Sequence, residues 1–544
     1  MFRRIPQSRY LVLALLFLPF ALRAQEYVRD QGPEVFTYPE LLKLGEESLE
    51  ESLQAKLRTL VTTPFVNNEA HYRGVRPARP NVKGLGRSLR VVHWNIERGM
   101  RFDEIVAALT DRNAFLELLP GGEHQVDAAR LLNELEALRT ADVLVLNEVD
   151  WGMRRSDYRN VIRDLGEALD MNWAFGVEFV EIDPISLGTE EFEELEDEAE
   201  RTEAVSEIQV DEDRIRALHG TAVLSRYPIR QVQLRPFKTV GYDWFAGERD
   251  RISKLEGGKR AVAANVFLEK VRREIRRGGR TTLYVELDVP DLPRGKLTVA
   301  APHLENRTAP KNRVAQMEET LEHLLEVRHP VVVAGDLNTT FSDTTPTSLK
   351  REIYHTLGSS QFWAEKGIKY ATGLGLAYDV LVGGANLLKN HSDPTAAHVP
   401  IVAPNPEYGL FERLETWRFA EGTVFDFRGD GDRSRDGKSG TLGNSNERDA
   451  KGFAETYAVT RTIGPTGKLK LDWILVKSYL EDPRDTKQTY RFAPHFARTM
   501  AEVNYALEER LSDHSPISVD LPFEEPGDVK PKHEGKKKWW KIGR

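Results

Sequence analysis

The sequence predicts an α/β protein, because short apolar stretches typical of buried strands alternate with amphipathic helical stretches along most of its 544 residues. The composition agrees with a globular protein, at 40% hydrophobic and 30% charged residues. Several apolar stretches also end in carboxylate, amide or imidazole side chains. The clearest is residues 331–338, which read Val-Val-Val-Ala-Gly-Asp-Leu-Asn. The chain is long enough to bury a large core.

Asp336 and Asn338 follow this strand two positions apart. Side chains two apart point to the same side of an extended backbone, so we expect both to lie on one face. A carboxylate and an amide that leave a buried strand together can hold a hard cation and orient a water molecule. The alternative for an isolated Asp-x-Asn is an Asx-type turn that caps the next helix.

The N-terminus has the pattern of a secretory signal peptide. Arg3, Arg4 and Arg9 precede an apolar run at residues 10–22, which is too short to span a bilayer. We therefore predict that residues 1–24 are an export signal, with an uncleaved membrane anchor as the alternative.

The remaining chain divides into three parts. Residues 25–88 are predicted to be a leader and linker that contains one helix, at about 38–61. Residues 89–523 are predicted to form one domain. Residues 524–544 are predicted to be a basic, disordered tail. The lysines and tryptophans near its end suggest peripheral membrane contact as an alternative role.

Two insertions interrupt the predicted domain, at about 183–216 and 342–465. The first is acidic and has helical spacing of apolar residues, which favours an amphipathic segment with a solvated face. The second contains acids at alternate positions in residues 430–436. It lacks the glycine and closing glutamate of a calcium loop, so a solvated loop is the better interpretation.

Composition excludes some chemistry. The chain has no cysteine, so disulfides, thiolate catalysis and zinc–sulfur sites are excluded. Its formal net charge is −9, and the acids are concentrated in residues 190–213. The overall charge therefore neither favours nor excludes an anionic substrate.

The predicted elements follow the chain in order. Strands are expected at residues 89–95, 141–146, 173–180, 219–229, 261–268, 281–289, 297–303, 331–334, 469–476 and 517–521. Helices are expected at residues 102–119, 126–138, 157–169 and 313–327.

Polar side chains stand at a comparable point on several of these strands. They are Asn95, Glu97, Glu148, His219, His303, Asp336, Asn338, Asp472, Asp513 and His514. Each alone has a structural explanation, but strand ends gathered in one sheet bring such groups to one cleft. Carboxylates and amides select Mg²⁺ or Mn²⁺, and imidazoles with them suit the attack of water on a phosphate ester.

These motifs resemble the endonuclease/exonuclease/phosphatase superfamily, which includes DNase I-like nucleases, neutral sphingomyelinases and inositol polyphosphate phosphatases. The resemblance covers about residues 90–521 and would make the chain an exported, bacterial-type member. It implies a DNase I-like, four-layer α/β sandwich of two packed mixed β-sheets flanked by helices. The motifs, in the family's order, are Trp94-Asn-Ile-Glu97, Leu146-Asn-Glu-Val149, Gly220-Thr-Ala-Val-Leu-Ser-Arg226, His303-Leu, Gly335-Asp-Leu-Asn338, Leu471-Asp-Trp-Ile474 and Ser512-Asp-His514.

The resemblance also implies roles for a metal site. Glu148 would be the main ligand of the metal, Asn95 and Glu97 would support metal or phosphate, and Asp513 would lie at the metal's edge.

The remaining implied roles concern the water and the phosphate. Asp336 would orient or deprotonate the attacking water, with Asn338 beside it. His514 would contact the phosphate, positioned by Asp472. The second active-site histidine would be His303, whereas His219 stands where some relatives carry a tyrosine.

Three functions remain open. A nucleic acid substrate is slightly favoured, because a basic arm at residues 270–280 is expected to project from a hairpin and could follow a phosphate backbone. A sphingomyelinase-like or phosphatase-like enzyme is the alternative, with Trp244, Phe245 and the tail at a membrane. A catalytically inactive binding module is disfavoured because the motif residues are intact. No obligate protein partner is predicted.

Overall fold

The computed structural model describes residues 27–121, 126–182, 210–249, 275–339, 408–426, 456–463, 466–479 and 491–525. Several predictions lie outside these residues: the signal peptide, most of the acidic segment, the strand at 261–268, the loop at 430–436 and most of the tail. Within the described ranges, no helix has both the length and the apolar character needed to cross a membrane.

The larger of two main sheets has ten strands in the described part of the chain. Their order is β1-β2-β6-β7-β5-β4-β17-β16, with β3 beside β4 and β9 beside β6. The sheet is mixed, because β4 and β5 are parallel while β5 and β7 are antiparallel. The strands are β1 (Asp30–Gln31), β2 (Phe65–Asn67), β3 (Asn81–Val82), β4 (Gly86–Arg98), β5 (Val143–Trp151), β6 (Asn172–Ile182), β7 (Leu218–Ser225), β9 (Ile275–Gly278), β16 (His495–Thr499) and β17 (Ile517–Pro522).

The smaller sheet has the strand order β15-β12-β11-β10-β8 and is also mixed, with β11 parallel to β12 and antiparallel to β10. A separate hairpin joins β13 to β14. These strands are β8 (Ile229–Pro236), β10 (Thr281–Asp288), β11 (Lys296–Pro302), β12 (Val331–Asp336), β13 (Tyr457–Ile463), β14 (Thr466–Leu469) and β15 (Asp472–Lys477).

Helices cover the outer face of each sheet. The larger sheet is covered by α1 (Tyr38–Lys43), α2 (Glu51–Thr62), α4 (Phe102–Thr110), α5 (Arg112–Glu117), α6 (Ala128–Arg139), α7 (Val161–Ala168) and α16 (Ala501–Asn504). The smaller sheet is covered by α11 (Pro310–Leu324) and α15 (Tyr408–Thr416). Short elements elsewhere are α3 (Glu69–Tyr72), α9 (Trp244–Arg249) and the 3₁₀ turns η1 (Arg154–Ser156) and η3 (Pro293–Gly295).

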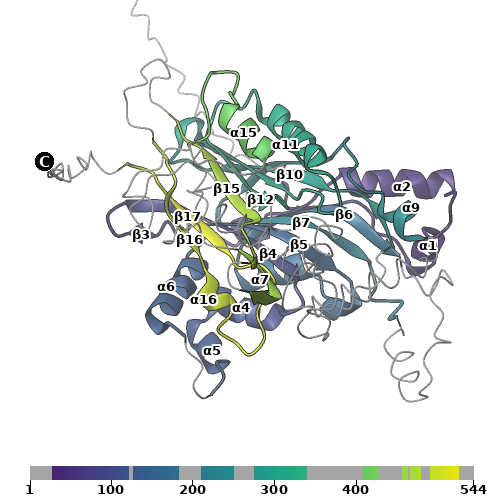
Figure 1. Ribbon diagram of the computed structural model, residues 1–544, viewed down its shortest axis with the longest axis horizontal. Helices are drawn as coiled ribbons and strands as arrows, with labels where there is room; N and C mark the ends of the chain where they lie inside the picture. The colour runs from purple at the N-terminus through teal and green to yellow at the C-terminus, as the bar shows by residue number, and fades with distance from the viewer. Residues whose placement is uncertain are drawn as a thin grey trace, which may run out of the picture.

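The layers stack as helix, sheet, sheet, helix (Figure 1). In that view α11 and α15 lie above β10, β12 and β15, while α4, α6 and α16 lie below β4 and β5. Apolar side chains of both sheets share one core between them, including Val91 of β4 and Val332 of β12. The predicted four-layer sandwich of two mixed sheets is therefore confirmed.

The strand alternation explains this packing. In β12, Val332 and Ala334 face the other sheet, whereas Val331 and Val333 face α11 and α15. Because both faces are buried, the strand is a continuous apolar run rather than an alternation of apolar and polar residues.

Residues 30–82 differ from the leader and linker that the sequence suggested. Their strands β1 and β2 extend the larger sheet through β6, and β3 pairs with β4. The single helix expected at 38–61 is two helices, α1 and α2, whose leucines pack on the larger sheet. The strands here have only two or three residues, too few to show a recognisable alternation in the sequence.

The suggested membrane contact through Trp244 is not supported. Trp244 is buried, and its Nε1 donates a hydrogen bond of 3.0 Å to Glu305 Oε2. The guanidinium groups of Arg276 and Arg307 lie 4.8 Å and 4.5 Å from its ring centre. Phe245 beside it is half-buried and lies against Arg277.

Gly335 marks a close approach of two backbones immediately before Asp336. A Cβ atom at Gly335 would lie 2.0 Å from the carbonyl oxygen of Pro302 in β11. We predict that Gly335→Ala lowers the free energy of unfolding by about 1–3 kcal/mol or more, because backbone rather than a flexible side chain must move. Chemical denaturation of the purified variant measures this.

The matched control is Gly279→Ala, since a Cβ at Gly279 meets no atom within 4 Å. This control is expected to change stability by no more than about 0.5 kcal/mol. Equal effects of the two alanines would show that the β11–β12 contact does not require glycine.

Candidate active site

The inner face of β4 changes from apolar to polar along its length. Leu89 and Val91 belong to the core between the sheets, and His93 and Asn95 continue the same face. In β5 the corresponding series is Val143, Val145 and Asn147, and β4 and β5 pair in parallel with Asn95 opposite Asn147. The polar ends of both strands therefore lie at the same level.

The smaller sheet repeats this change at the same level. In β12, Val332 and Ala334 are followed on the same face by Asp336. Asp472 begins the antiparallel strand β15 and pairs directly with Asp336. Asn95 Nδ2 of the larger sheet donates to Asp336 Oδ2 at 3.2 Å, which joins the polar ends of the two sheets.

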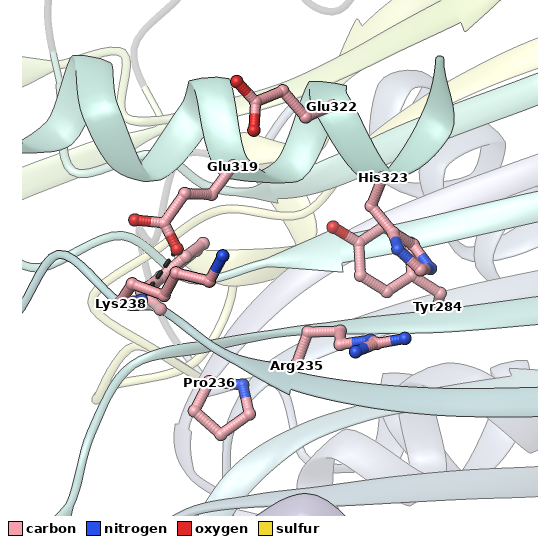
Figure 2. A pocket seen from close by; sticks show the side chains of 8 residues that line it. Arg235, Pro236, Lys238, Tyr284, Glu319, Glu322 and His323 are labelled. Carbon is pink, nitrogen blue, oxygen red and sulfur yellow. Dashed lines mark hydrogen bonds between the residues drawn. The ribbon is translucent and has the colours of Figure 1, made fainter. Parts of the chain in front are cut away.

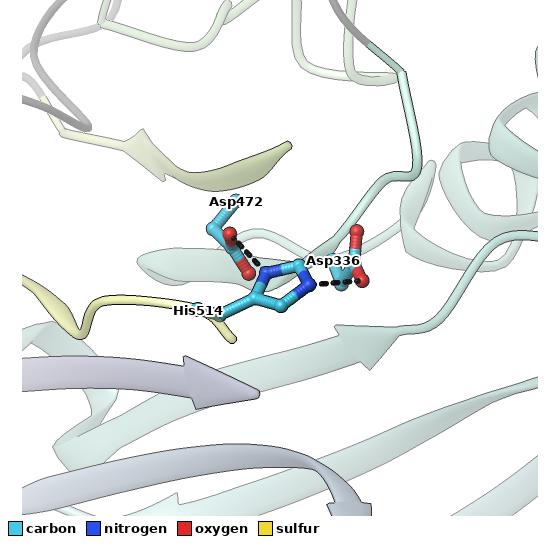
Figure 3. A group of neighbouring side chains, drawn as sticks. All are labelled: Asp336, Asp472 and His514. Atoms are coloured by element: carbon cyan, nitrogen blue, oxygen red, sulfur yellow. Dashed lines mark hydrogen bonds and ion pairs between the residues drawn. The ribbon is translucent and has the colours of Figure 1, made fainter. Parts of the chain in front are cut away.

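His514 lies between the two aspartates (Figure 3). Its Nδ1 donates to Asp472 Oδ2 at 2.7 Å, and its Nε2 lies 3.8 Å from Asp336 Oδ2. All three side chains are buried. The structure thus brings together Asp336, Asp472 and His514, which lie in three separate motifs of the sequence.

The loop that carries His514 is held by the larger sheet. Trp94 Nε1 donates to the His514 carbonyl at 2.8 Å, and Ser512 Oγ donates to the Asn95 carbonyl at 2.7 Å. Asn504 Nδ2 donates to the Ser512 carbonyl at 2.8 Å, and the Ser512 backbone N–H donates to Asn504 Oδ1 at 3.2 Å. These contacts fix the backbone of the motif Ser512-Asp513-His514.

The pKa values of His514, Asp472 and Asp336 shift in different directions. Burial opposes the charged form of each group. For His514 the surrounding carboxylates outweigh burial and hold its pKa well above the usual value. For Asp472 the His514 charge and the hydrogen bonds from two imidazoles hold the pKa well below the usual value. For Asp336 burial dominates and raises the pKa.

Asp336 closes an Asx-type turn at the end of β12, and Asn95 closes one where the pairing of β4 becomes irregular. Glu97 N donates to Asn95 Oδ1 at 3.1 Å, and Asn338 N donates to Asp336 Oδ1 at 2.8 Å. The expected extended geometry between Asp336 and Asn338 is therefore wrong, because Asn338 has a φ of +45° and turns away. The amide of Asn338 donates to the Leu304 carbonyl at 3.0 Å.

Glu97, Glu148 and Asp513 form an oxygen-rich group beside this centre. The backbone N–H of Asp513 donates to Glu97 Oε2 at 2.9 Å. Burial raises the pKa of Asp513, and the neighbouring Glu148 carboxylate raises it further. Burial also opposes ionisation of Glu148, but the charges of Arg98 and nearby side chains lower its pKa to about 2.

This donor set fits a hard divalent cation. It offers carboxylate oxygens from Glu97, Glu148 and Asp513 and the amide of Asn95, and mutual repulsion of Glu148 and Asp513 would be relieved by a positive ion. A different group, Asp336, Asp472 and His514, is the one whose ligand atoms lie within 4.8 Å of one another among the described residues. It fits a metal poorly, because His514 Nδ1 is protonated towards Asp472 and its pKa is raised.

His303 enters the site from the end of β11. Its Nε2 lies 3.9 Å from Asp336 Oδ2 and has no hydrogen-bond partner among the described residues. Arg280 Nη1 lies 2.7 Å from His303 Nδ1, and Glu178 Oε1 lies 3.2 Å from it. Because a guanidinium only donates and this contact is the shorter, we assign the ring hydrogen to Nε2, facing Asp336.

The prediction that residues 270–280 form a projecting basic arm is wrong for the arginines that the structure describes. Arg276 and Arg280 are buried, and Arg280 donates to Glu178 Oε2 at 2.8 Å. Arg277 donates to the Leu44 carbonyl. Ile275–Gly278 forms β9, which pairs with β6 instead of making the expected hairpin. Arg272 and Arg273 lie outside the described residues.

His219 is held by a carboxylate of its own. Its Nδ1 bonds Asp150 Oδ1 at 2.8 Å, and Arg155 clamps Asp150 through bonds of 2.6 Å and 3.0 Å. His219 is close enough to Glu148 for its charge to lower the carboxyl pKa. The sequence motifs predicted His219 as a site residue but did not predict its supporting residues Asp150 and Arg155.

Other supporting residues were also missed. Asn147 Oδ1 accepts from Asp336 N at 2.8 Å, and Asn147 Nδ2 donates to Thr221 Oγ1 at 2.8 Å. Thr221 in turn donates to Glu178 Oε1 at 2.5 Å. Two-residue spacing could have found Thr221, which lies two positions beyond His219. No local signal identifies Glu178, whose partners come from other strands.

A shallow pocket elsewhere does not belong to this site. It lies between α11 and the outer side of the smaller sheet, where Arg235, Tyr284, Glu319 and His323 line it (Figure 2). Tyr284 packs in the core beneath α11, on the face of the sheet opposite to the strand-end residues. Its charges are mixed, and it contains none of the motif residues.

Comparison with known proteins gives one family and several similar folds. The family model described as "Endonuclease/Exonuclease/phosphatase family" matches residues 92–514. No curated protein matches the chain in sequence.

Three solved structures are among those that resemble it. An endonuclease/exonuclease/phosphatase from Beutenbergia cavernae is 17% identical, over 80% of this chain and 71% of that one, with a TM-score of 0.33. A 3'-5' exonuclease from Neisseria meningitidis is 13% identical, over 80% and 99%, with a TM-score of 0.34. The human Nocturnin catalytic domain is 14% identical, over 80% and 92%, with a TM-score of 0.31.

The family match starts inside β4 and ends at His514, so it includes every strand-end residue described above. It covers well over half of the chain and confirms the resemblance inferred from the motifs. The chain therefore belongs to the endonuclease/exonuclease/phosphatase family.

Proposed function

We propose that this protein is a metal-dependent phosphoesterase that hydrolyses phosphodiester bonds by the attack of water. The observation that carries the proposal is the convergence on Asp336 Oδ2. His514 Nε2 and His303 Nε2 lie 3.8 Å and 3.9 Å from this oxygen, and Asn95 donates to it. A carboxylate base can accept a proton from water, and the hydrogen-bond donors around it can bind a phosphate beside that water.

Asp336 is the base in this proposal. Its raised pKa makes the carboxylate a better proton acceptor than an exposed aspartate. Asp336 takes a proton from the water as the water oxygen bonds to phosphorus. The ester P–O bond then breaks, and the leaving oxygen takes a proton from solvent.

His514 and His303 act on the phosphate. His514 remains an imidazolium at neutral pH because Asp472 pairs with it, so it can stabilise negative charge but cannot accept a proton. His303 presents its Nε2–H to the same oxygen of Asp336. His219, held by Asp150, is a third imidazole for the phosphate or the leaving group.

Glu148, Glu97, Asp513 and Asn95 would hold Mg²⁺ or Mn²⁺. Such an ion would neutralise phosphate charge and stabilise the leaving oxygen. The low pKa of Glu148 supports this assignment, because the carboxylate is ionised and ready to bind at any physiological pH.

Nucleic acid is the first substrate to test, because the family name includes nucleases. Arg276 and Arg280 are buried and no longer support a backbone-tracking arm, and buried Trp244 no longer supports a lipid surface. The proposal therefore rests on the phosphoester chemistry and not on either surface.

A substrate panel tests the reaction and the metal together. Full-length protein with Mg²⁺ is incubated with bis(4-nitrophenyl) phosphate, plasmid DNA, RNA, sphingomyelin and phosphoinositides. We expect turnover of at least one phosphodiester, its loss in EDTA, and its recovery with Mg²⁺ or Mn²⁺. Full activity in chelator would refute the metal assignment, and no turnover with any substrate would refute the proposed reaction.

A second prediction concerns the pair Asp472 and His514. Asp472→Ala and His514→Ala should each lower kcat about 10²-fold or more, because an imidazole without its carboxylate is neither held nor charged. The double variant should have about the same kcat as the less active single variant, since the two residues act as one unit. Multiplying losses in the double variant would contradict this.

Export is also a proposal, carried by the signal-like pattern of residues 1–24. Expression in a bacterial host with intact-mass measurement of the exported protein tests it. We expect a mature N-terminus near Gln25. A full-length mass in the membrane fraction would indicate an uncleaved anchor instead.

A further inference from the structure

His93 is a fully buried imidazole in the middle of the site, outside all the roles described above. It lies on β4 two residues before Asn95, so the two side chains share the face between the sheets. Its backbone neighbours on the adjacent strands are Val145 and Ile517, both of which belong to the apolar core. His93 therefore occupies the last apolar layer below the polar strand ends.

Both ring nitrogens of His93 are used. Nε2 lies 2.9 Å from Asp472 Oδ1, and Nδ1 lies 3.1 Å from the Val145 carbonyl. A carboxylate only accepts hydrogen bonds, so Nε2 is the donor to Asp472, and Nδ1 faces the backbone carbonyl. The bond to Val145 belongs to the neighbouring strand of the same sheet, whereas the bond to Asp472 crosses to the other sheet.

The two oxygens of Asp472 consequently have different imidazole partners. Oδ1 accepts from His93, and Oδ2 accepts from His514 at 2.7 Å. A carboxylate held at one oxygen can rotate about its side-chain bonds, whereas one held at both oxygens by rigid rings has a fixed plane. His93 itself cannot move, because its second nitrogen is bound to the backbone of β5.

We propose that His93 is a positioning residue of the active site, and that it acts by fixing the carboxylate of Asp472 so that Oδ2 faces His514. The hydrogen-bonded series runs from the Val145 carbonyl through His93 and Asp472 to His514, whose Nε2 faces Asp336. This inference deepens the proposed function and rests on it.

Two amide substitutions separate the two bonds of His93. In His93→Gln the amide nitrogen can take the place of Nε2 and donate to Asp472. In His93→Asn the shorter side chain places its amide nitrogen near Nδ1, where it can donate only to Val145. Both variants stay polar and similar in shape, so both are expected to fold.

The kinetic test uses bis(4-nitrophenyl) phosphate with Mg²⁺. We expect His93→Asn to lower kcat about 10- to 100-fold with little change in KM, as for outer partners of catalytic groups, and His93→Gln to keep most of the activity. In an Asp472→Ala background, His93→Asn should cause no further loss. His329→Gln is the matched control, a partly buried histidine at the opposite end of β12, bonded to Thr298.

A spectroscopic test needs no substrate. The Nδ1–H proton of His514, bonded to a carboxylate, should give a low-field ¹H NMR signal that Asp472→Ala abolishes. This signal should persist in His93→Gln and weaken or move upfield in His93→Asn. If the wild type hydrolyses no phosphodiester, the proposed function fails while this measurement still tests the role of His93.

The inference is overturned by any of three results. His93→Asn could keep wild-type kcat with the His514 signal unchanged. His93→Asn could be as active as, or more active than, His93→Gln. The loss from His93→Asn could multiply with that from Asp472→Ala, which would indicate general damage to the fold rather than an effect through Asp472.

Discussion

A charged side chain buried between two packed sheets has to be paired, and this requirement organises the centre of the molecule. Two buried histidines have a carboxylate at Nδ1, Asp472 for His514 and Asp150 for His219, and beside His303 the buried Glu178 is paired with Arg280. Removing one partner would leave the other charge unpaired in a low-dielectric interior, which costs about 3–5 kcal/mol. The same histidine–carboxylate pairs that stabilise the buried charges also fix the orientation of each imidazole ring.

This pairing has a chemical consequence, because neighbouring groups acquire pKa shifts of opposite direction. Asp472 and Glu178 are held as carboxylates, His514 is held as an imidazolium, and the pKa of Asp336 is raised by its burial. A single site thereby contains a carboxylate of raised pKa at Asp336, a positive charge at His514 and an ionised carboxylate at Glu148. The arrangement needs both sheets, since Asp336 and Asp472 belong to the smaller sheet and Asn95 and Glu148 to the larger.

The arginines that the sequence suggested as a nucleic-acid arm have a different use. Arg280 lies against Glu178 and His303, and Arg276 lies against Glu181 and the ring of Trp244. Their charges support the buried carboxylates on the β6 side of the site. Arg276 and Arg280 are therefore structural residues and do not indicate a nucleic-acid substrate.

The α/β class, the position of most strands and the residues Asp336, Asp472 and His514 could be predicted from the sequence. Each of the three residues stands at a junction of an apolar run and a polar motif. The two-residue alternation of a strand also places His93, two positions before Asn95, on the same face as Asn95. The partners became visible only in the folded protein: Asp472 has two imidazole partners, Glu178 and Arg280 flank His303, and strands within residues 30–82 extend the larger sheet. These contacts join strands far apart in the chain, and no local periodicity records which strands become neighbours.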